Sequence, residues 1–441
     1  MLRDVVAEVE REYLARLLPL YDGDRADQTK RLLQQHVPVL RFEGKENFSP
    51  MSALLYLVCS TIWYIPLKKP WKDYSEIGRL DILRTSPHVQ LDTDYELEFL
   101  SEDEDRAMEE VPEQRVDLTG PGLEALFAAH PASSYDNVRR VVWRKIHRLL
   151  AINRFRIPSE KEEEAGAGIL ALHFADTIQG WWLWCPRLWL PRNTPEKARQ
   201  KYNLLTGAGE DVCYYGRVVD QCGYRILQYW FFYAFNDWWS DLPFVNKHEG
   251  DWECVFIFGK PSGDSGFIPT HTAYSSHGNS GKKVHRRWED VEKFDGSHPV
   301  VYVARGSHAN YYTAGRHHWF LADSARGDGR VIEPGDWGEI QLLIDDEPWD
   351  EPEWLFFRGF WGAHIRDFFT TQSAPAGPHY SPELITGRPR PRSKWWKPRE
   401  WAGLNCMLEE SGVECDHDIR GWAESRALEW EPYWGGMVRQ T

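Results

Sequence analysis

Residues 226–235 read ILQYWFFYAF, a run of apolar and aromatic residues interrupted by a single glutamine. Three similar runs follow it, namely DWECVFIFGK at 251–260, THTAYSSHG at 270–278 and HPVVYVARG at 298–306. Aromatic and β-branched residues favour strands, and the Gly, Pro, Asn and Asp residues around these runs are typical of turns. Several short strands at this spacing are typical of a sandwich. We therefore expect a mainly β fold with an antiparallel β-sandwich core.

A helical N-terminal segment and a largely helical insertion precede this β region, which makes the expected class α+β overall. Apolar residues recur at helical spacing at the start of the chain, and a later helix is expected from about Pro195. The stretch HVPVLRF at 36–42 has strand character and is assigned to the sandwich. The predicted organisation has helices at 1–35, a β-sandwich core from 36–67 and 216–385, a largely helical insertion or lid at 68–215, and a basic, Trp-rich tail at 386–441.

Composition narrows the expected partners. Aromatic residues make up 14% of the chain, with 23 Trp, and such side chains suit carbohydrate or lipid-headgroup surfaces as well as cores. The net charge of −15 argues against an overall electrostatic footprint for nucleic acid, so no nucleic-acid partner is expected. Residues 92–117 carry 12 acidic residues against 2 arginines, a net of −10, which indicates a solvated acidic loop.

The tail has the opposite charge. Its segment RPRPRSKWWKPR at 388–399 contains six basic residues and no acidic one. Two interpretations stay open, a Pro-rich linker or surface strap on the one hand and a contact for an anionic surface on the other.

Cysteine usage and hydropathy suggest a compartment. The seven cysteines include no CxxC pair and do not resemble a disulfide framework, which favours a reducing environment. The N-terminus lacks the apolar core of a signal peptide, and no apolar stretch is long and uninterrupted enough to span a membrane. We expect a cytoplasmic protein that is peripheral to membranes.

The densest cluster of potential metal ligands is HEGDWE at 248–253. Side chains alternate along a strand, so Asp251 and Glu253 should share one face, with Cα atoms about 6.6 Å apart. Both carboxylates can then lean onto one divalent cation. His248 precedes them and can supply a third ligand, because Gly250 allows the chain to turn. The competing interpretation is a polar strand end that faces solvent or pairs with arginine.

Two later histidines stand at the ends of predicted strands. His277 belongs to AYSSHG, and His308 follows the apolar run that ends in VARGSH. Each is either a hydrogen-bonding loop residue or a ligand. Asp237 and Asp241, in the loop before HEGDWE, are candidates for an extra oxygen ligand. A mixed His and carboxylate set suits Mg²⁺, Mn²⁺, Ca²⁺ or Zn²⁺, and the sequence does not choose between them.

The order of these motifs resembles a known family. QYWFFYAFND, HEGDWECVFIF, AYSSHG, PVVYVARGSHANYY, FFRGFWG and SAPAGPHY follow one another as in the vacuolar protein sorting-associated protein 62 family, with its plant and microbial relatives of unknown function. HVPVLRF and the FSP after it are similar to the N-terminal strand of that family. The resemblance covers residues 36–62 and 224–382, and it implies protein transport or another membrane-associated process.

A more distant resemblance is to the necrosis- and ethylene-inducing-peptide-like proteins, secreted β-sandwich cytolysins that bind a divalent cation. Their heptad GHRHDWE is similar to the segment at 247–253, and their Ser-Ala-His-Gly motif is similar to SSHG here. This resemblance implies cation ligands at His248, Asp251 and Glu253, with the upstream Asp at Asp241 and the later His at His308. Their second His is Gly250 here and their Arg is Glu249, so extracellular toxicity is not implied.

Three functions compete at this stage. The first is a cation-dependent binding module that recognises a lipid headgroup or glycan, with Trp238 and Trp239 as an exposed stacking surface and with His277 and Glu249 as further binding residues. The second is a metal-dependent hydrolase with Glu249 or His277 as general base, although HExxH, GxSxG, Walker and GxGxxG motifs are absent. The third is a non-catalytic scaffold that binds partners through its acidic loop and basic tail.

Overall fold

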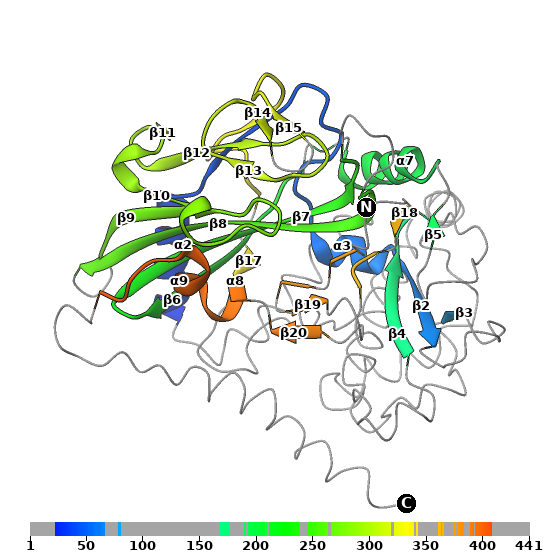
Figure 1. Ribbon diagram of the computed structural model, residues 1–441, viewed down its shortest axis with the longest axis horizontal. Helices are drawn as coiled ribbons and strands as arrows, with labels where there is room; N and C mark the ends of the chain where they lie inside the picture. Colours follow the sequence, from blue (N-terminus) through cyan, green and yellow to red (C-terminus); the bar gives the residue numbers. More distant parts are fainter. Residues whose placement is uncertain are drawn as a thin grey trace, which may run out of the picture.

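The computed structural model describes residues 23–66, 78–80, 168–175, 189–190, 193–207, 209, 211–238, 246–262, 266–318, 322–338, 341–342, 360–362, 364–365, 374–375, 377–378, 380–382, 389–391 and 393–407. Two β-sheets account for the centre of this part of the chain, and short helices cover them (Figure 1).

The larger sheet has eight strands and is built around two long antiparallel ones. Tyr233 lies opposite Asp251, and Phe231 lies opposite Glu253. Aromatic residues dominate β7, and nearly all side chains of both strands are buried. The strands of this sheet, in the order of the path, are β10 (His285–Arg287), β9 (Gly266–Tyr274), β8 (His248–Ser262), β7 (Tyr224–Asn236), β6 (Tyr215–Gln221) and β17 (Gln341–Leu342), with β18 (His364–Ile365) joining β8 to β5 (Trp189–Leu190).

The smaller sheet has five strands and brings distant parts of the sequence together. Its strands are β11 (Lys293–Phe294), β12 (His298–Val303), β1 (Val39–Phe42) and β16 (Val331–Ile332), with β13 (Asn310–Tyr311) paired to β12. β1 runs parallel to β12, with Val39 opposite Val300. The stretch 36–42 therefore contributes a strand to a sheet whose other members lie more than 250 residues later.

The two sheets pack face to face. The Tyr274 hydroxyl of β9 donates to the Val300 carbonyl of β12 across 3.1 Å. The Tyr229 hydroxyl of β7 donates to the Leu33 carbonyl of helix α2 (Gly23–Gln35) across 2.9 Å. Figure 1 shows β12 and β13 above the long strands β7 and β8. The predicted mainly β fold with an antiparallel sandwich core is confirmed.

The opposite face of the larger sheet is closed by aromatic packing from helices. Tyr56 packs on Phe232 with ring centroids 4.8 Å apart, and Trp401 packs on Phe256 at 5.3 Å. The helices that provide these contacts are α3 (Ala53–Val58), α8 (Ser393–Trp396) and α9 (Pro398–Ala402). Much of the high Trp and Tyr content is thus used in the core.

Shorter elements complete the described part of the chain. They are β2 (Thr61–Pro66), β3 (Gly78–Leu80), β4 (Gly168–His173), α7 (Thr194–Thr206), η4 (Gly281–Lys283), η5 (Trp288–Asp290), β14 (Gly315–His318), β15 (Ala322–Ala325), β19 (Tyr380–Pro382) and β20 (Pro389–Pro391). β2 pairs with both β3 and β4 in a separate three-stranded sheet.

The helix expected from about Pro195 is confirmed as α7, which ends at Gly207 in the left-handed region. Most of the predicted insertion at 68–215, including the acidic loop at 92–117, lies outside the described residues. Its described parts are β3, β4 and β5 as well as α7. Residues 1–22 of the predicted N-terminal helices and residues 408–441 of the tail also lie outside.

Two further observations concern chemistry and membranes. Within the described residues, Cys222 is a free thiol, whereas Cys406 is disulfide-bonded. No helix among the described residues combines the length and apolar composition that a membrane span requires.

The tail is anchored in the core rather than draped over it as a linker. Trp395 is fully buried, and its ring packs on Trp230 with centroids 5.3 Å apart. The Arg217 guanidinium lies 4.3 Å from the centre of the Trp395 ring and also donates to its carbonyl oxygen. The described part of the tail is therefore a structural element of the sandwich.

We expect Trp395→Ala to lower the free energy of unfolding by about 3–5 kcal/mol, because it opens a cavity and removes the stacking partner of Arg217. Urea denaturation followed by tryptophan fluorescence measures this change. Leu204→Ala, at a side chain that is 53% exposed, should change stability by less than about 0.5 kcal/mol. Equal effects of the two substitutions would contradict the anchoring role.

Candidate functional site

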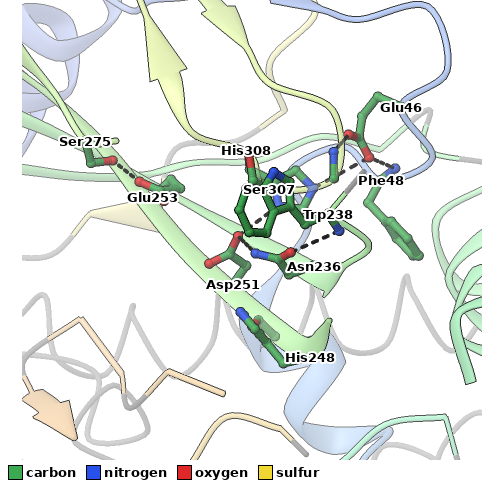
Figure 2. A network of polar contacts seen from close by, with 12 residues as sticks. Glu46, Phe48, Asn236, Trp238, His248, Asp251, Glu253, Ser275, Ser307 and His308 are labelled. Atoms are coloured by element: carbon green, nitrogen blue, oxygen red, sulfur yellow. Dashed lines mark hydrogen bonds and ion pairs between the residues drawn. The ribbon is translucent and has the colours of Figure 1, made fainter. Parts of the chain in front are cut away.

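The site is built where β8 begins, and Gly250 determines its geometry. This residue has φ +63°, a conformation that favours glycine. In a regular strand, Glu249 and Asp251 would share a face. Here Glu249 points toward the end of β4, whereas Asp251 faces the loop that carries His308. The turn also leaves His248 beside Asp251, as Figure 2 shows.

Asp251 is one end of a buried chain of charges. Its Oδ2 accepts hydrogen bonds from His308 Nδ1 at 2.9 Å and from Asn236 Nδ2 at 3.2 Å. On the other side of the same ring, His308 Nε2 lies 3.5 Å from Glu46 Oε1. The imidazole of His308 is thus held between two carboxylates that lie more than 200 residues apart in the sequence (Figure 2).

The surrounding backbone and one aromatic ring fix the charged side chains of Glu46 and His308 in place. Glu46 accepts hydrogen bonds from the backbone N–H groups of Asn47, Phe48 and Gly306. His308 adopts a left-handed φ of +51°, and its ring stacks on Tyr233 at 3.8 Å with an interplanar angle of 3°. The backbone N–H groups of Phe48 and Gly306 fix Glu46, and Tyr233 of β7 supports the ring, so the imidazole of His308 is held in place.

The charge states of Glu46, His308 and Asp251 follow from the geometry of this ion-pair network. Burial lowers the pKa of His308, but the charge of Glu46 and the hydrogen bond to Asp251 outweigh burial and raise that pKa to about 9. Burial alone would raise the carboxylate pKa values of Glu46 and Asp251, yet His308 holds both below their ordinary values. His308 is consequently a cation and both carboxylates are anions near neutral pH.

Glu253 occupies the next position on the same face of β8. The Ser275 hydroxyl donates to its Oε2, and the same hydroxyl accepts the backbone N–H of Cys254. Burial raises the pKa of Glu253 to about 7, and the charge of Asp251 acts in the same direction, while Lys394 opposes it. Negative charge is therefore poorly compensated at this position.

Another buried carboxylate, that of Asp323, lies nearby on β15. Asp323 accepts hydrogen bonds from Trp238 Nε1, His277 Nε2 and the Tyr311 hydroxyl, each at 2.6 Å, and from Ser307 at 3.1 Å. These donors hold the pKa of Asp323 below its ordinary value against the effect of burial. Asp323 in turn raises the pKa of His277 despite burial.

The structure brings together some of the predicted site residues. His248, Asp251 and His308 form one cluster, and Glu253 adjoins it along β8 (Figure 2). His277 and Trp238 gather at Asp323 instead. Trp239 and Asp241 lie outside the described residues.

Three predicted site residues lie in environments that do not suit the roles predicted for them. Trp238 is only 4% exposed, so its ring is no open stacking surface. Glu249 is fully buried and accepts from the His173 ring and from the backbone N–H groups of Phe174 and Ala175, which leaves it poorly placed as a general base. Asp237 forms an ion pair with Lys247.

Sequence reasoning missed Glu46, Asn236, Ser275 and Asp323. Glu46 stands in a short polar stretch before FSP, and Asp323 lies in LADSA, where nothing but an isolated acid among apolar residues marks it. Within the described residues, no group of three or more His, Cys, Asp or Glu side chains is arranged to hold a metal ion.

Gly250→Ala should lower the free energy of unfolding by more than about 2 kcal/mol. The added Cβ would overlap the carbonyl oxygen of Trp361, and a left-handed φ is itself unfavourable for alanine. Thermal and urea unfolding measure the change. Gly335→Ala is the matched control, because a Cβ there meets no neighbouring atom, and an equal loss in both variants would refute this role of Gly250.

The Glu46–His308 pair predicts a pH dependence of stability. The folded pKa of His308, about 9, lies above the ordinary value of 6.5, so its stabilisation is complete below about pH 6.5 and is lost as the pH rises toward about 9. The loss has a slope of up to about 1.4 kcal/mol per pH unit. Urea unfolding in chelator across this window should show it.

Glu46→Gln removes the carboxylate that raises the pKa of His308 most, so its stability should fall less steeply over the same window. Glu333→Gln, at an exposed position, should keep the steep wild-type dependence. Parallel curves for wild type and Glu46→Gln would contradict the ion pair.

Comparison with known proteins gives one sequence relative. No protein-family model matches the chain. The chain is 31% identical to the Saccharomyces cerevisiae protein named "Putative vacuolar protein sorting-associated protein TDA6", over a region that covers 33% of this chain and 37% of the yeast protein. The match thus spans little more than a third of the relative's length. It confirms the similarity to vacuolar sorting-associated proteins that the motifs predict.

Solved structures of the toxin-like group also match, at low similarity. "Crystal structure of non-toxic HaNLP3 protein" shares 14% identity over 30% of this chain and 51% of that chain, with a TM-score of 0.20. "NLPPya in complex with mannosamine" shares 12% identity over 44% of this chain and 68% of that chain, with a TM-score of 0.23. At such TM-scores these matches carry no argument about this chain.

Proposed function

We propose that this protein is a divalent-cation-dependent binding module whose cation is held by Asp251 and Glu253 on the inner face of β8. The observation that carries this proposal is that two buried carboxylates, those of Asp251 and Glu253, stand on one face of β8. Burial and the charge of Asp251 together raise the pKa of Glu253 to about 7, although Lys394 opposes them. Buried charges in proteins are paired or coordinate metals.

The donor atoms suit a hard cation. The hydrogen bonds that Asp251 accepts within the described residues all end on Oδ2, and the one that Glu253 accepts ends on Oε2. One oxygen of each carboxylate is thereby left for another partner. The Tyr233 hydroxyl lies near both and is buried without a hydrogen-bond partner in the described part of the chain. Oxygen ligands of this kind are those that Mg²⁺, Mn²⁺ and Ca²⁺ prefer.

We propose His248 as a nitrogen ligand. Because no three described His, Cys, Asp or Glu side chains are arranged to hold a metal ion as they stand, cation binding would draw His248 toward Asp251 and Glu253. Its Nδ1 lies 2.9 Å from the Gly250 carbonyl oxygen, so Nδ1 carries a proton and donates. Burial lowers the pKa of His248, which favours the neutral ring with a lone pair on Nε2. A ring held through one nitrogen by a carbonyl oxygen is the usual state of a metal-binding histidine.

His308 takes a different role in this proposal from the ligand role expected from sequence. A ring that is protonated on both nitrogens has no lone pair for a metal. His308 therefore positions Asp251 by donating to Oδ2 and fixes the loop through Glu46. Asp241 stays a predicted ligand outside the described residues.

The ligand of the module is proposed to be a lipid headgroup or a glycan, in a membrane-associated process. Support comes from the similarity to a vacuolar sorting-associated protein. The cation would order the loops around β8 and neutralise the carboxylates.

Protein stripped with chelator should regain stability when a divalent cation is added, by about 2.7 kcal/mol at a hundredfold excess over Kd. Asp251→Asn/Glu253→Gln should abolish this gain, because it removes the anionic oxygens. Elemental mass spectrometry of the purified protein and thermal melts with Mg²⁺, Mn²⁺, Ca²⁺ or Zn²⁺ measure both effects.

Asp295→Asn/Glu333→Gln removes the same charge from exposed positions and should behave as wild type does. The proposal fails if no ion is bound and the melting temperatures of all three proteins stay unchanged when the cations are added. It also fails if the double substitution in the site leaves the cation effect intact.

A further inference from the structure

Two basic segments that are far apart in the sequence meet at one edge of the sandwich. The first runs from η4 into β10, and the second forms α8 and α9. Trp401 Nε1 donates to the Asn279 carbonyl oxygen at 3.1 Å, and the His285 ring lies 2.6 Å from the Ala402 carbonyl oxygen. Gly403 packs directly against Gly281. The contact brings the two basic segments side by side at this edge, and Figure 1 shows α9 near the end of the larger sheet that β9 and β10 form.

This surface, the basic edge, carries a local excess of positive charge. From η4 to Asp295 and along α8 and α9, the cations are Lys282, Lys283, Arg286, Arg287, Lys293, Lys394, Lys397 and Arg399, and the acids are Glu289, Asp290, Glu292, Asp295 and Glu400. Lys282 and Lys283 are exposed, and the Lys394 ammonium lies 5.3 Å from the centre of the Trp401 ring. A positive surface on a chain of net charge −15 is opposite in sign to the molecule as a whole.

Exposed apolar side chains accompany these charges. β10 ends the larger sheet and β11 ends the smaller one, and η5 connects the two, so both strands lie at the same edge of the sandwich. Ile268 of β9 is 55% exposed and Phe294 of β11 is 39% exposed. They are two of the four large apolar side chains that the described residues expose to this extent.

We propose that the basic edge docks on the surface of a lipid bilayer that contains anionic headgroups. Clustered Lys and Arg side chains are attracted to the negative potential of such a surface, and each contributes to binding. Ile268 and Phe294 gain by entering the boundary between headgroups and acyl chains. A nucleic acid would engage the cations but would offer these two side chains no apolar environment.

This docking surface is independent of the proposed cation site. Asp251 and Glu253 lie inside the sandwich, whereas Lys282 and Lys283 lie on its outer edge. Binding to anionic vesicles should therefore persist in chelator and in Asp251→Asn/Glu253→Gln. Failure of one proposal leaves the other standing.

The test is co-sedimentation of the full chain with vesicles in chelator. The vesicles are phosphatidylcholine alone or phosphatidylcholine with about a third phosphatidylserine. Wild type should bind the anionic vesicles only, and less as NaCl rises from about 0.05 M to about 0.5 M. Lys282→Glu/Lys283→Glu should weaken binding at least about tenfold. Ile268→Ser/Phe294→Ser should also weaken it.

Lys197→Glu/Arg199→Glu is the matched control, because it makes the same change in net charge at exposed positions of α7. It should bind as wild type does, and thermal melts confirm that each variant is folded. The proposal is overturned if wild type ignores anionic vesicles, in which case the charges serve to protect the edge strands. It is also overturned if both charge variants lose vesicle binding equally. The same holds if the protein binds duplex DNA through the basic edge but does not bind the vesicles.

Discussion

The ion-pair chain from Glu46 through His308 to Asp251 joins three segments that only the folded structure brings together. Glu46 follows β1, His308 lies between β12 and β13, and Asp251 belongs to β8. A protonated imidazole between two carboxylates is stable in a buried place only when both partners are held firmly. Here the backbone N–H groups of Phe48 and Gly306 hold one carboxylate, and Asn236 assists at the other. The chain thus fixes the end of the sandwich where the candidate site lies.

A second constraint is the close approach of Gly250 to the segment around Trp361. Because no Cβ intervenes, the Trp361 backbone reaches β8, and the Tyr56 hydroxyl donates to the same Trp361 carbonyl oxygen. The positive φ at Gly250 then sends Glu249 to one face and Asp251 to the other. Glu249 closes the end of β4 by accepting from His173, Phe174 and Ala175. One glycine therefore separates a structural carboxylate from those of the candidate site.

Sequence reasoning reached the fold because strand signals are local. The runs at 226–235 and 251–260 have strand composition and lie wholly within β7 and β8, and the run at 270–278 lies in β9 as far as Tyr274. Alternation along β8 also placed Asp251 and Glu253 together, since both residues lie after the turn at Gly250. It could not separate Glu249 from them, because a positive φ changes the alternation and cannot be seen in residue types alone.

The remaining gaps in the sequence-based site arise from long-range pairing. Glu46 and Asp323 were missed because their importance depends on His308 and on the group around Trp238, which are distant in the chain. The polar loop around Trp238 predicts an exposed ring. In the structure, however, the indole N–H donates to Asp323 and the ring is buried. A high aromatic content therefore indicates a polar binding surface only where the aromatic residues are not already buried in the core.

The two electrostatic features of the molecule meet at Lys394. This residue lies on α8, within the basic edge, and its charge lowers the pKa of Glu253 against the effects of burial and of Asp251. A cation at Asp251 and Glu253 would neutralise the same carboxylate far more strongly than a lysine at the sandwich edge. Lys394 thus acts electrostatically on the interior, whereas Lys282 and Lys283 lie on the outer edge, away from Asp251 and Glu253. The basic edge therefore keeps its positive charge whether or not a cation is bound inside the sandwich.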